Sequence, residues 1–246
     1  MAGLLRLFAV PALLAALTGC SPQSETPEDS PLSDPFPLER HEISRDHPRL
    51  LGDAAYLKAL AAERPEAWSR TLEQARAGVD DHAGIVSCGL AYVIEGDEEL
   101  SGRAKALALE IVREGVMQGH VRFGDALADI ALGYDLTYPL WTAEEKQEFF
   151  RYFNETVDAN TGSEPHVFHN GWYSYKHWGY GLAGYATFYE NERSPRIVAD
   201  LERKCRELVV PAFALAGDGG GWAEGYYVNY WIYEWTFFCE VARRVE

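Results

Sequence analysis

The sequence predicts an all-α fold: an incomplete (α/α) toroid of helical hairpins, preceded by a signal peptide and a disordered tether. From about residue 52 onward, apolar residues recur with helical spacing and few segments alternate as strands do. Segments rich in small and apolar residues alternate with charged, amphipathic ones. The run Gly89-Leu90-Ala91 returns as Gly181-Leu182-Ala183, 92 residues later (181 minus 89). This offset equals two periods of about 46 residues, as expected of a helical repeat.

The first residues are predicted to be a lipoprotein signal peptide, covering residues 1–19. Arg6 precedes an apolar run that is too short to cross a bilayer. The run ends in Leu17-Thr18-Gly19 before Cys20, which resembles a bacterial lipobox, whose cysteine becomes lipidated. Ser21 follows instead of Asp, which resembles the outer-membrane sorting pattern. We therefore expect a lipid anchor through Cys20 in the bacterial cell envelope, at the outer membrane, facing the periplasm or the cell surface. An ordinary secretory signal is the alternative.

Residues 20–45 are predicted to be a disordered linker, because they are rich in Pro, Ser, Glu and Asp and poor in large apolar residues. Residues 46–246 are predicted to form the toroid domain. Its helices are expected at residues 53–62, 65–79, 83–95, 101–117, 125–137, 143–158, 179–189, 195–208 and 225–241. Thr142 and Glu145 form a capping box that starts the helix at residue 143.

The small and apolar helices are expected to form an inner layer, and the charged ones an outer layer. The predicted inner helices begin at residues 83, 125, 179 and 225. An open solenoid of the HEAT sort would also satisfy this alternation. Close packing of inner helices rich in Gly and Ala favours the closed ring. Residues 97–99 are predicted to form a solvated turn.

Composition and charge exclude some classes of function. The chain has 246 residues, 38 acidic and 22 basic, and a formal net charge of −16. Nucleic acid is therefore not expected as a partner, since binding it needs clustered Lys and Arg. Four cysteines without CxxC spacing exclude a zinc ribbon. Besides Cys20, the cysteines Cys88, Cys205 and Cys239 are expected to be buried thiols.

Aromatic residues concentrate in two windows, residues 166–180 and 218–231. Five of the seven tryptophans fall in or just after them, namely Trp172, Trp178, Trp222, Trp231 and Trp235. Each window is predicted to lie on a Gly-containing loop that leads into an inner helix. Loops at one edge of a layered array share a face, so we expect both windows to converge on a central cleft.

The residue types in these windows suit carbohydrate chemistry. Trp and Tyr faces stack on sugar rings and supply hydrogen-bond donors. Asn and His donors can stabilise the charge that spreads onto a carboxylate when the neighbouring proton leaves. A Tyr or His can take that proton, and a Tyr can return one to the departing glycosidic oxygen. This set requires no metal and no organic cofactor.

Three motifs, in this order and spacing, resemble the toroid domain of the heparinase II/III-like and alginate-lyase-like polysaccharide lyases. They are His47-Pro48-Arg49-Leu50-Leu51, the pair His169-Asn170 followed by Trp172, and Asp218-Gly219-Gly220 followed by Trp222-Ala223-Glu224-Gly225. Members of these families cleave uronic-acid polysaccharides by β-elimination. The similarity covers the chain from about residue 47 to its end, and it implies an acidic polysaccharide or oligosaccharide as the substrate.

The resemblance implies roles for particular residues. Asn170 and His169 would neutralise the substrate carboxylate and handle protons, and Tyr227 would be the catalytic acid or base. Tyr230 and Tyr226 are close rivals, because the stretch after Glu224 is short. We expect the substrate to be bound by Trp172, Tyr175, Lys176, His177, Trp222, Glu224 and Tyr226. The inserted Gly171 departs from the family pattern. Since relatives continue with further helices and a β-sandwich, the resemblance also implies that this chain is truncated at its C-terminus.

Two other functions fit the sequence. One is an inverting glycoside hydrolase on an (α/α) toroid, with Glu224 and either Asp218 or Asp125 as its carboxylate pair. The other is a non-catalytic surface lipoprotein that binds glycans by aromatic stacking. We rank the lyase first, the hydrolase second and the binding protein third. His47 is expected to be structural.

Overall fold

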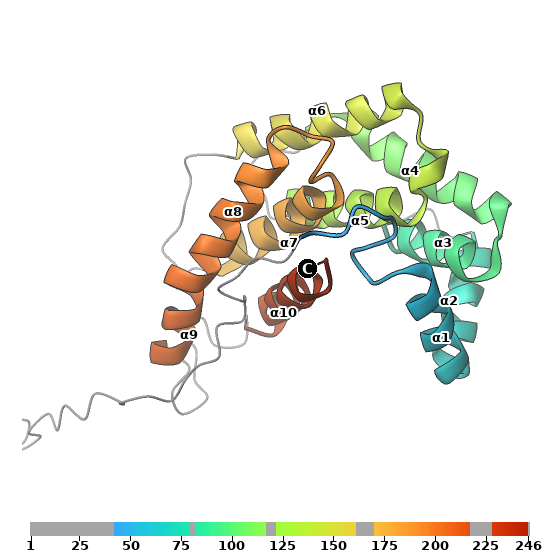
Figure 1. Cartoon of the computed structure of the whole chain (residues 1–246), viewed down its shortest axis with the longest axis horizontal. Helices are drawn as coiled ribbons and strands as arrows, with labels where there is room; N and C mark the ends of the chain where they lie inside the picture. Colours follow the sequence, from blue (N-terminus) through green and yellow to red (C-terminus); the bar gives the residue numbers. More distant parts are fainter. Residues whose placement is uncertain (1–41, 79–81, 117–121, 161–169, 217–227, 246) are drawn as a thin grey trace, which may run out of the picture. The chain divides into compact units, whose positions relative to one another are not determined.

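The computed structural model describes residues 42–78, 82–116, 122–160, 170–216 and 228–245 (Figure 1). These residues form helices joined by turns and contain no strand, so the prediction of an all-α fold is confirmed. The helices are α1 (Ala54–Glu63), α2 (Pro65–Arg76), α3 (His82–Glu95), α4 (Glu98–Glu114), α5 (Arg122–Leu136), η1 (Tyr138–Leu140), α6 (Ala143–Ala159), α7 (Asn170–Ala186), α8 (Ser194–Lys204), the π-helical turn η2 (Cys205–Val209), α9 (Val210–Ala216) and α10 (Val228–Val245).

Helices α3, α5, α7 and α10 pack side by side in this order, with α5 between α3 and α7, and α7 between α5 and α10. Their contacts advance in the same direction along both partners of each pair. In α3 and α5, Ile85 lies against Gly133 and Gly89 lies against Leu136. In α5 and α7, Phe123 lies beside Tyr180, and the Tyr134 hydroxyl donates to Glu190 just after α7. In α7 and α10, Trp178 contacts Tyr233 and Tyr185 contacts Phe238. The helices therefore run parallel. Helices α7 and α10 begin at the same side of the layer, whereas α5 begins beside Gly179, part-way along α7.

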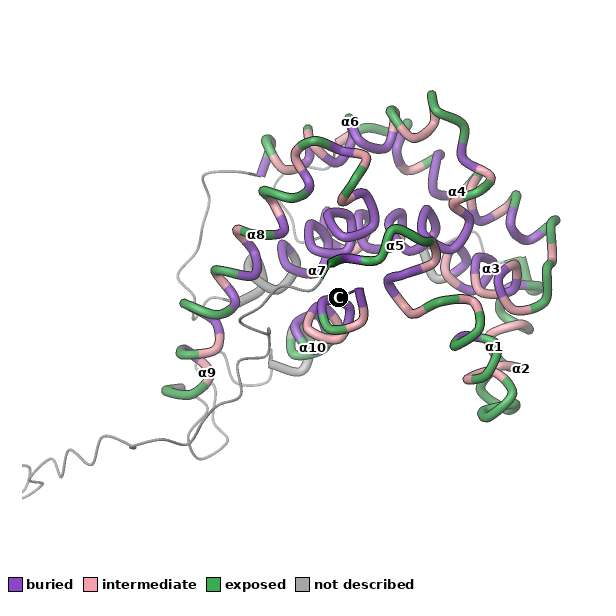
Figure 2. The backbone as a smooth tube through the Cα atoms, viewed as in Figure 1, coloured by how far each residue is buried: buried purple, intermediate pink, exposed green. Residues whose placement is uncertain are grey.

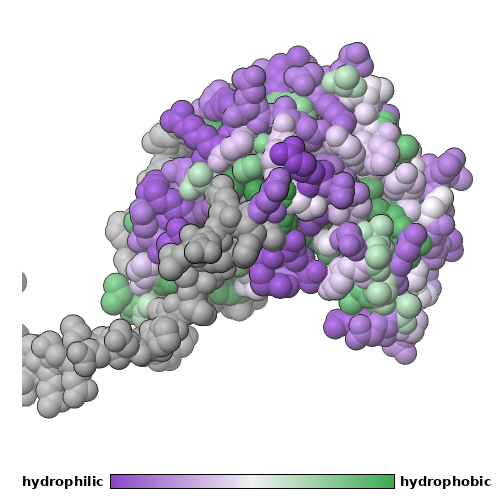
Figure 3. All heavy atoms as spheres, in the orientation of Figure 1, coloured by the Kyte–Doolittle hydropathy of each residue, from purple (hydrophilic) through white to green (hydrophobic). Residues whose placement is uncertain are grey.

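The remaining helices cover this inner layer. Helix α4 packs on α3 and α5, α6 on α4 and α7, and α8 on α7. Helix α5 is buried along most of its length, whereas α6 and α8 alternate between buried and exposed positions (Figure 2). The surface along α6 is largely hydrophilic in the view of Figure 3. The alternation of apolar and amphipathic helices in the sequence thus corresponds to inner and outer positions.

Glycines let the inner helices approach closely. A Cβ on Gly179 of α7 would lie 2.7 Å from the Cα of Gly124 in α5, which is closer than such atoms come. The repeated run also packs in a repeated way: a Cβ on Gly89 would meet Leu136 of α5, and one on Gly181 would meet Phe238 of α10. In both copies the glycine faces the next inner helix along the chain.

Local structure differs from the sequence prediction in two places. Helix α7 begins at Asn170, nine residues before the predicted start at 179 (179 minus 170). Most of the first aromatic window is therefore helical rather than a loop, because a single early glycine does not outweigh tertiary packing. Residues 97–99 are exposed or half-buried, as a solvated turn would be, but they start a helix: Asp97 is the N-cap of α4, which begins at Glu98 instead of the predicted residue 101, and its carboxylate accepts from the Leu100 N–H at 3.0 Å. The capping box of Thr142 and Glu145 is confirmed.

Within the described ranges, no helix is both long and apolar enough to cross a membrane.

Candidate functional site

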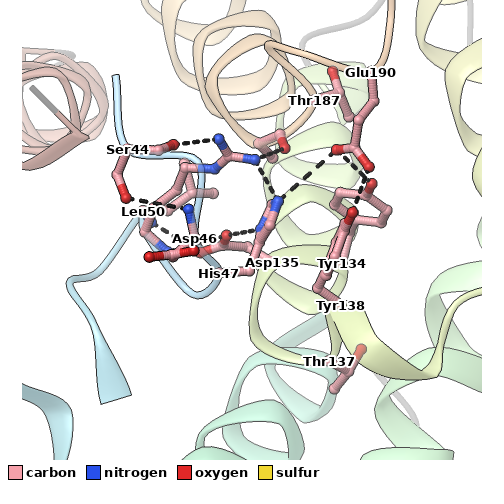
Figure 4. A network of polar contacts seen from close by, with 12 residues as sticks. Ser44, Asp46, His47, Leu50, Tyr134, Asp135, Thr137, Tyr138, Thr187 and Glu190 are labelled. Atoms are coloured by element: carbon pink, nitrogen blue, oxygen red, sulfur yellow. Dashed lines mark hydrogen bonds and ion pairs between the residues drawn. The ribbon is translucent and has the colours of Figure 1, made fainter. Parts of the chain in front are cut away.

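A dense polar network lies at the C-terminal ends of α5 and α7 (Figure 4). Its centre is Asp135, whose side chain is fully buried. One carboxylate oxygen is 2.6 Å from Nδ1 of His47, and the two oxygens accept the backbone N–H groups of Arg49 and Leu50 at 2.8–3.1 Å. The pair His47 and Asp135 joins segments 88 residues apart in the chain.

Glu190 is the second carboxylate of this network. It accepts hydrogen bonds from the hydroxyls of Tyr134 at 3.0 Å and Tyr138 at 2.7 Å, and from Nζ of Lys146 at 3.3 Å. The ring of His47 stacks on Tyr138 with centroids 3.9 Å apart, and its Nε2 lies 3.8 Å from Glu190. Burial and the negative charge of Glu190 both raise the pKa of Tyr134, so this hydroxyl remains a donor.

The segment that carries His47 ties three inner helices together at this end. The Arg49 guanidinium donates to the carbonyl of Ala186, the last residue of α7, at 3.0 Å. The Ser44 N–H donates to the carbonyl of Val245 at the end of α10 at 2.9 Å. Both contacts satisfy carbonyl groups that helix C-termini leave without partners. We call residues 43–50 the strap, and the network it completes the closed end; the expected structural role of His47 agrees with these contacts.

The opposite side of the inner layer, at the N-terminus of α5 and the N-terminal halves of α7 and α10, has a different character, and we call it the open end. Trp178 of α7 packs against Tyr233 and Phe237 of α10, with ring centroids 5.7 and 4.6 Å apart. Tyr233 remains 57% exposed. Asp125 and Asp129 lie one turn apart near the start of α5. Aromatic faces and carboxylates from different helices therefore meet here.

Glu234 is the most unusual group of the open end. Its residue is only 7% exposed, and its Oε2 has no hydrogen-bond partner among the described residues. Burial, reinforced by the charge of Asp125, raises the pKa of Glu234 from 4.5 to about 7. Burial also raises the pKa of the neighbouring Tyr233, with Glu234 and Asp129 contributing. Glu234 can thus hold or release a proton near neutral pH, which suits general acid or base chemistry.

The sequence analysis did not single out Glu234. The residue lies within the aromatic run Tyr230-Trp231-Ile232-Tyr233-Glu234-Trp235, and this run was interpreted as an inner helix. One acidic residue inside an aromatic run on a buried helix indicates a candidate functional group. Burying an unpaired carboxylate costs free energy, and such groups concentrate at functional sites.

Of the predicted site residues, Lys176 and His177 lie on described parts of α7. Both are buried. The Nε2 of His177 is 3.0 Å from the Leu201 carbonyl, and its ring packs against Trp235 and Phe238. This is a core position between α8 and α10, and the substrate-binding role of His177 stays a prediction.

Four other predicted residues lie on helices whose first turns are described only as backbone. Asn170 is the first residue of α7, Trp172 and Tyr175 follow in the same helix, and Tyr230 lies in the first turn of α10. These four residues therefore lie in the N-terminal halves of α7 and α10, on the side of the layer that includes the open end. Outside the described residues lie Cys20, His169, Asp218, Trp222, Glu224, Tyr226 and Tyr227.

No group of three or more His, Cys, Asp or Glu side chains within the described ranges is arranged to hold a metal ion. No protein-family model, curated protein or solved structure matches the chain. The functional argument therefore depends on the chemistry of the open end and on the sequence motifs.

Proposed function

We propose that this chain is the toroid region of a polysaccharide lyase that cleaves a uronic-acid-containing polysaccharide by β-elimination at the open end. The observation that carries the proposal is the parallel arrangement of α5, α7 and α10. It brings the first turns of α7 and α10 to the same end, together with a carboxyl group whose pKa is about 7. In this proposal the helical layers form an incomplete (α/α) toroid anchored to the cell envelope through Cys20.

Parallel helices also answer the objection raised by the charge of the chain. A formal net charge of −16 repels polyanions at long range. The N-terminal end of each helix carries a partial positive charge, and the N-terminal ends of α7 and α10 point to the same side of the layer, whereas α5 begins beside Gly179, part-way along α7. Repulsion between exposed charges is screened beyond about 10 Å at ordinary salt, so the local field at the helix ends decides binding.

In the proposed reaction, Asn170 and His169 donate hydrogen bonds to the uronate carboxylate. These bonds stabilise the negative charge that develops when the neighbouring C–H proton is removed. Tyr227, or its rival Tyr230, takes this proton and returns one to the glycosidic oxygen as the C–O bond breaks and a C4–C5 double bond forms. A protonated Glu234 would add a further donor near neutral pH, as neutral carboxylic acids in apolar sites do.

The test uses the full chain with alginate, heparan sulfate, hyaluronan and ulvan, while ultraviolet absorbance from the new double bond is followed. We expect absorbance to rise with at least one polymer and Asn170→Ala to lower the rate by about 100-fold or more. Tyr92→Phe on α3, which removes a polar group away from the open end, is the control and should retain activity. Absence of absorbance with every uronate polymer would overturn the proposal.

A specific observation favours a second candidate, an inverting glycoside hydrolase. The raised pKa of Glu234 beside Asp125 is the pattern of a carboxyl pair in which one member stays protonated as the general acid. The pair proposed from sequence used Glu224 with Asp218 or Asp125; in the structure the charge of Asp125 acts on Glu234, while Glu224 and Asp218 lie outside the described residues. Release of reducing sugar without ultraviolet absorbance, abolished by Glu234→Gln, would identify the hydrolase. Glycan binding without any turnover would instead identify the non-catalytic lipoprotein.

A further inference from the structure

An apolar cavity of about 350 Å³ lies between α10 and the first three helices, and its volume is within the range of small-molecule sites. Its wall includes Leu60 of α1, Leu90 and Ile94 of α3, and Phe237 and Val241 of α10. Helices α3 and α10 are the first and last members of the inner layer. The cavity therefore lies where the two edges of this layer face each other, and in Figure 3 the surface is hollowed between α10 and α1.

The uncharged polar side chains of the wall already have hydrogen-bond partners. The Tyr56 hydroxyl accepts from Nη2 of Arg244 at 2.9 Å, and Nε1 of Trp68 donates to Glu95 at 3.1 Å. The Thr71 hydroxyl donates at 3.1 Å to the backbone carbonyl four residues before it. Because these polar groups are bonded within the protein, the cavity suits an alkyl chain better than a sugar ring.

Three charged residues line the cavity, and they leave an excess of positive charge at its opening. Glu240 accepts from Arg243 at 2.7 and 2.8 Å and lies 2.7 Å from Nε of Arg244, so its charge is compensated. The Arg64 guanidinium is exposed and has no hydrogen-bond or ion-pair partner within the described part of the chain. An anionic group is the electrostatic complement of this opening.

Contacts within the protein hold Arg244 at the opening. Its guanidinium lies over the ring of Tyr56, 4.5 Å from the centroid, and its side chain is 23% exposed. Nε and Nη2 of this group are bonded to Glu240 and Tyr56, which leaves Nη1 without a partner among the residues described. A guanidinium that is already held in place loses less conformational entropy when it binds a carboxylate.

We propose that this cavity binds a free fatty acid, with its alkyl chain inside and its carboxylate at Arg64 and Arg244. The volume of about 350 Å³ accommodates about a dozen groups of the size of a water molecule, each occupying roughly 30 Å³. A single alkyl chain of medium length is of this size. One turn of an α-helix with its side chains occupies roughly 400–600 Å³, so a helix of a second copy does not fit.

The test is isothermal titration calorimetry of the full chain with sodium dodecanoate below its micelle concentration. We expect saturable one-to-one binding in the micromolar range. Dodecyltrimethylammonium has the same tail and a cationic head, and it should bind at least about 10-fold more weakly because the two arginines repel it. The proposal does not depend on the lyase function.

Two substitutions separate the head of the ligand from its tail. Arg64→Gln should weaken dodecanoate binding about 10-fold, since it removes a charge-assisted hydrogen bond. Arg70→Gln is the matched control: Arg70 lies on α2, is exposed and does not line the cavity, so affinity should be unchanged. Ala61→Trp places an indole ring in the cavity and should abolish binding without lowering the melting temperature.

Three results would overturn the proposal. The first is the absence of saturable dodecanoate binding to the unsubstituted chain. The second is equal binding of dodecanoate and dodecyltrimethylammonium, or equal effects of Arg64→Gln and Arg70→Gln. The third is a dimer in analytical ultracentrifugation that Ala61→Trp disrupts and dodecanoate does not, which would assign the cavity to a second copy of the chain.

Discussion

The two ends of the inner layer differ in whether their buried carboxylate has hydrogen-bond partners. At the closed end, the buried carboxylate Asp135 accepts hydrogen bonds from an imidazole and two backbone N–H groups. At the open end, Glu234 is also buried, but one of its oxygens has no partner among the described residues and its pKa is raised to about 7. The same helices, α5 and α7, contribute to both ends. A satisfied charge stabilises the fold, whereas an unsatisfied one is available for chemistry.

The largest expected loss of stability comes from removing the carboxylate at the centre of the closed end. Asp135→Ala would leave His47 and the backbone N–H groups of Arg49 and Leu50 buried without their acceptor. We expect a loss of about 3–5 kcal/mol in the free energy of unfolding, measured by urea denaturation. A loss below about 1 kcal/mol would mean that the strap does not depend on this carboxylate.

The next largest expected effect is the contribution of Glu234 to the free energy of unfolding, which depends on pH. Because the folded-state pKa is about 7 and the ordinary value is 4.5, the folded state binds more protons than the unfolded state between these pH values. Its contribution to stability is complete below pH 4.5 and is lost as the pH rises to about 7. Glu234→Gln should remove this dependence and stabilise the protein at pH 8 by up to about 3 kcal/mol.

Glu240→Gln on the same helix is the matched control for that prediction. Hydrogen bonding to Arg243 lowers the pKa of Glu240, so its stabilising contribution exists at neutral pH and is lost on acidification. Denaturation curves at several pH values should therefore change in opposite directions for the two variants. A curve for Glu234→Gln parallel to that of the unsubstituted chain at all pH values would contradict the contrast between the ends.

A smaller effect tests what holds α5 against α7 near the open end. Gly179→Ala would place a Cβ 2.7 Å from the Gly124 Cα, and backbone cannot move aside as a side chain can. We expect a loss of about 1–3 kcal/mol in thermal or urea denaturation. Gly102→Ala in α4, where the Cβ would meet nothing within 4 Å, should be neutral or stabilising by up to about 1 kcal/mol. Equal effects of both substitutions would exclude the close approach.

The smallest effect compares one tyrosine from each end. Tyr138→Phe removes a 2.7 Å hydrogen bond to Glu190 and should cost about 1 kcal/mol. Tyr233→Phe at the open end should change the free energy of unfolding by less than about 0.5 kcal/mol, since Tyr233 is 57% exposed. A greater loss for Tyr233→Phe than for Tyr138→Phe would reverse the assignment of the two ends.

Much of the fold follows from local sequence signals. Helical spacing, the capping box at Thr142 and the alternation of apolar and amphipathic segments predicted the helices and which of them are buried. The repeated run at Gly89 and Gly181 predicted a helical repeat, and in the structure each of these glycines faces the next inner helix. These features depend on residues a few positions apart, so pattern alone can identify them.

The polar contacts could not be predicted in the same way. His47 and Asp135 are 88 residues apart, and the sequence around either residue does not indicate that the two are in contact. The start of α7 was placed too late because Gly171 and the aromatic run suggested a loop. Glu234 was missed because its unusual pKa arises from burial and from Asp125 on another helix.

The central claim, that the open end is the functional end, depends most on the protonation of Glu234. NMR of isotope-labelled glutamate carboxyl carbons, compared between the unsubstituted chain and Glu234→Gln, would assign this group and follow its titration. The account predicts a midpoint near pH 7 that moves when uronate oligosaccharide is added. A titration midpoint of Glu234 near pH 4.5 that does not change when oligosaccharide is added would contradict the account.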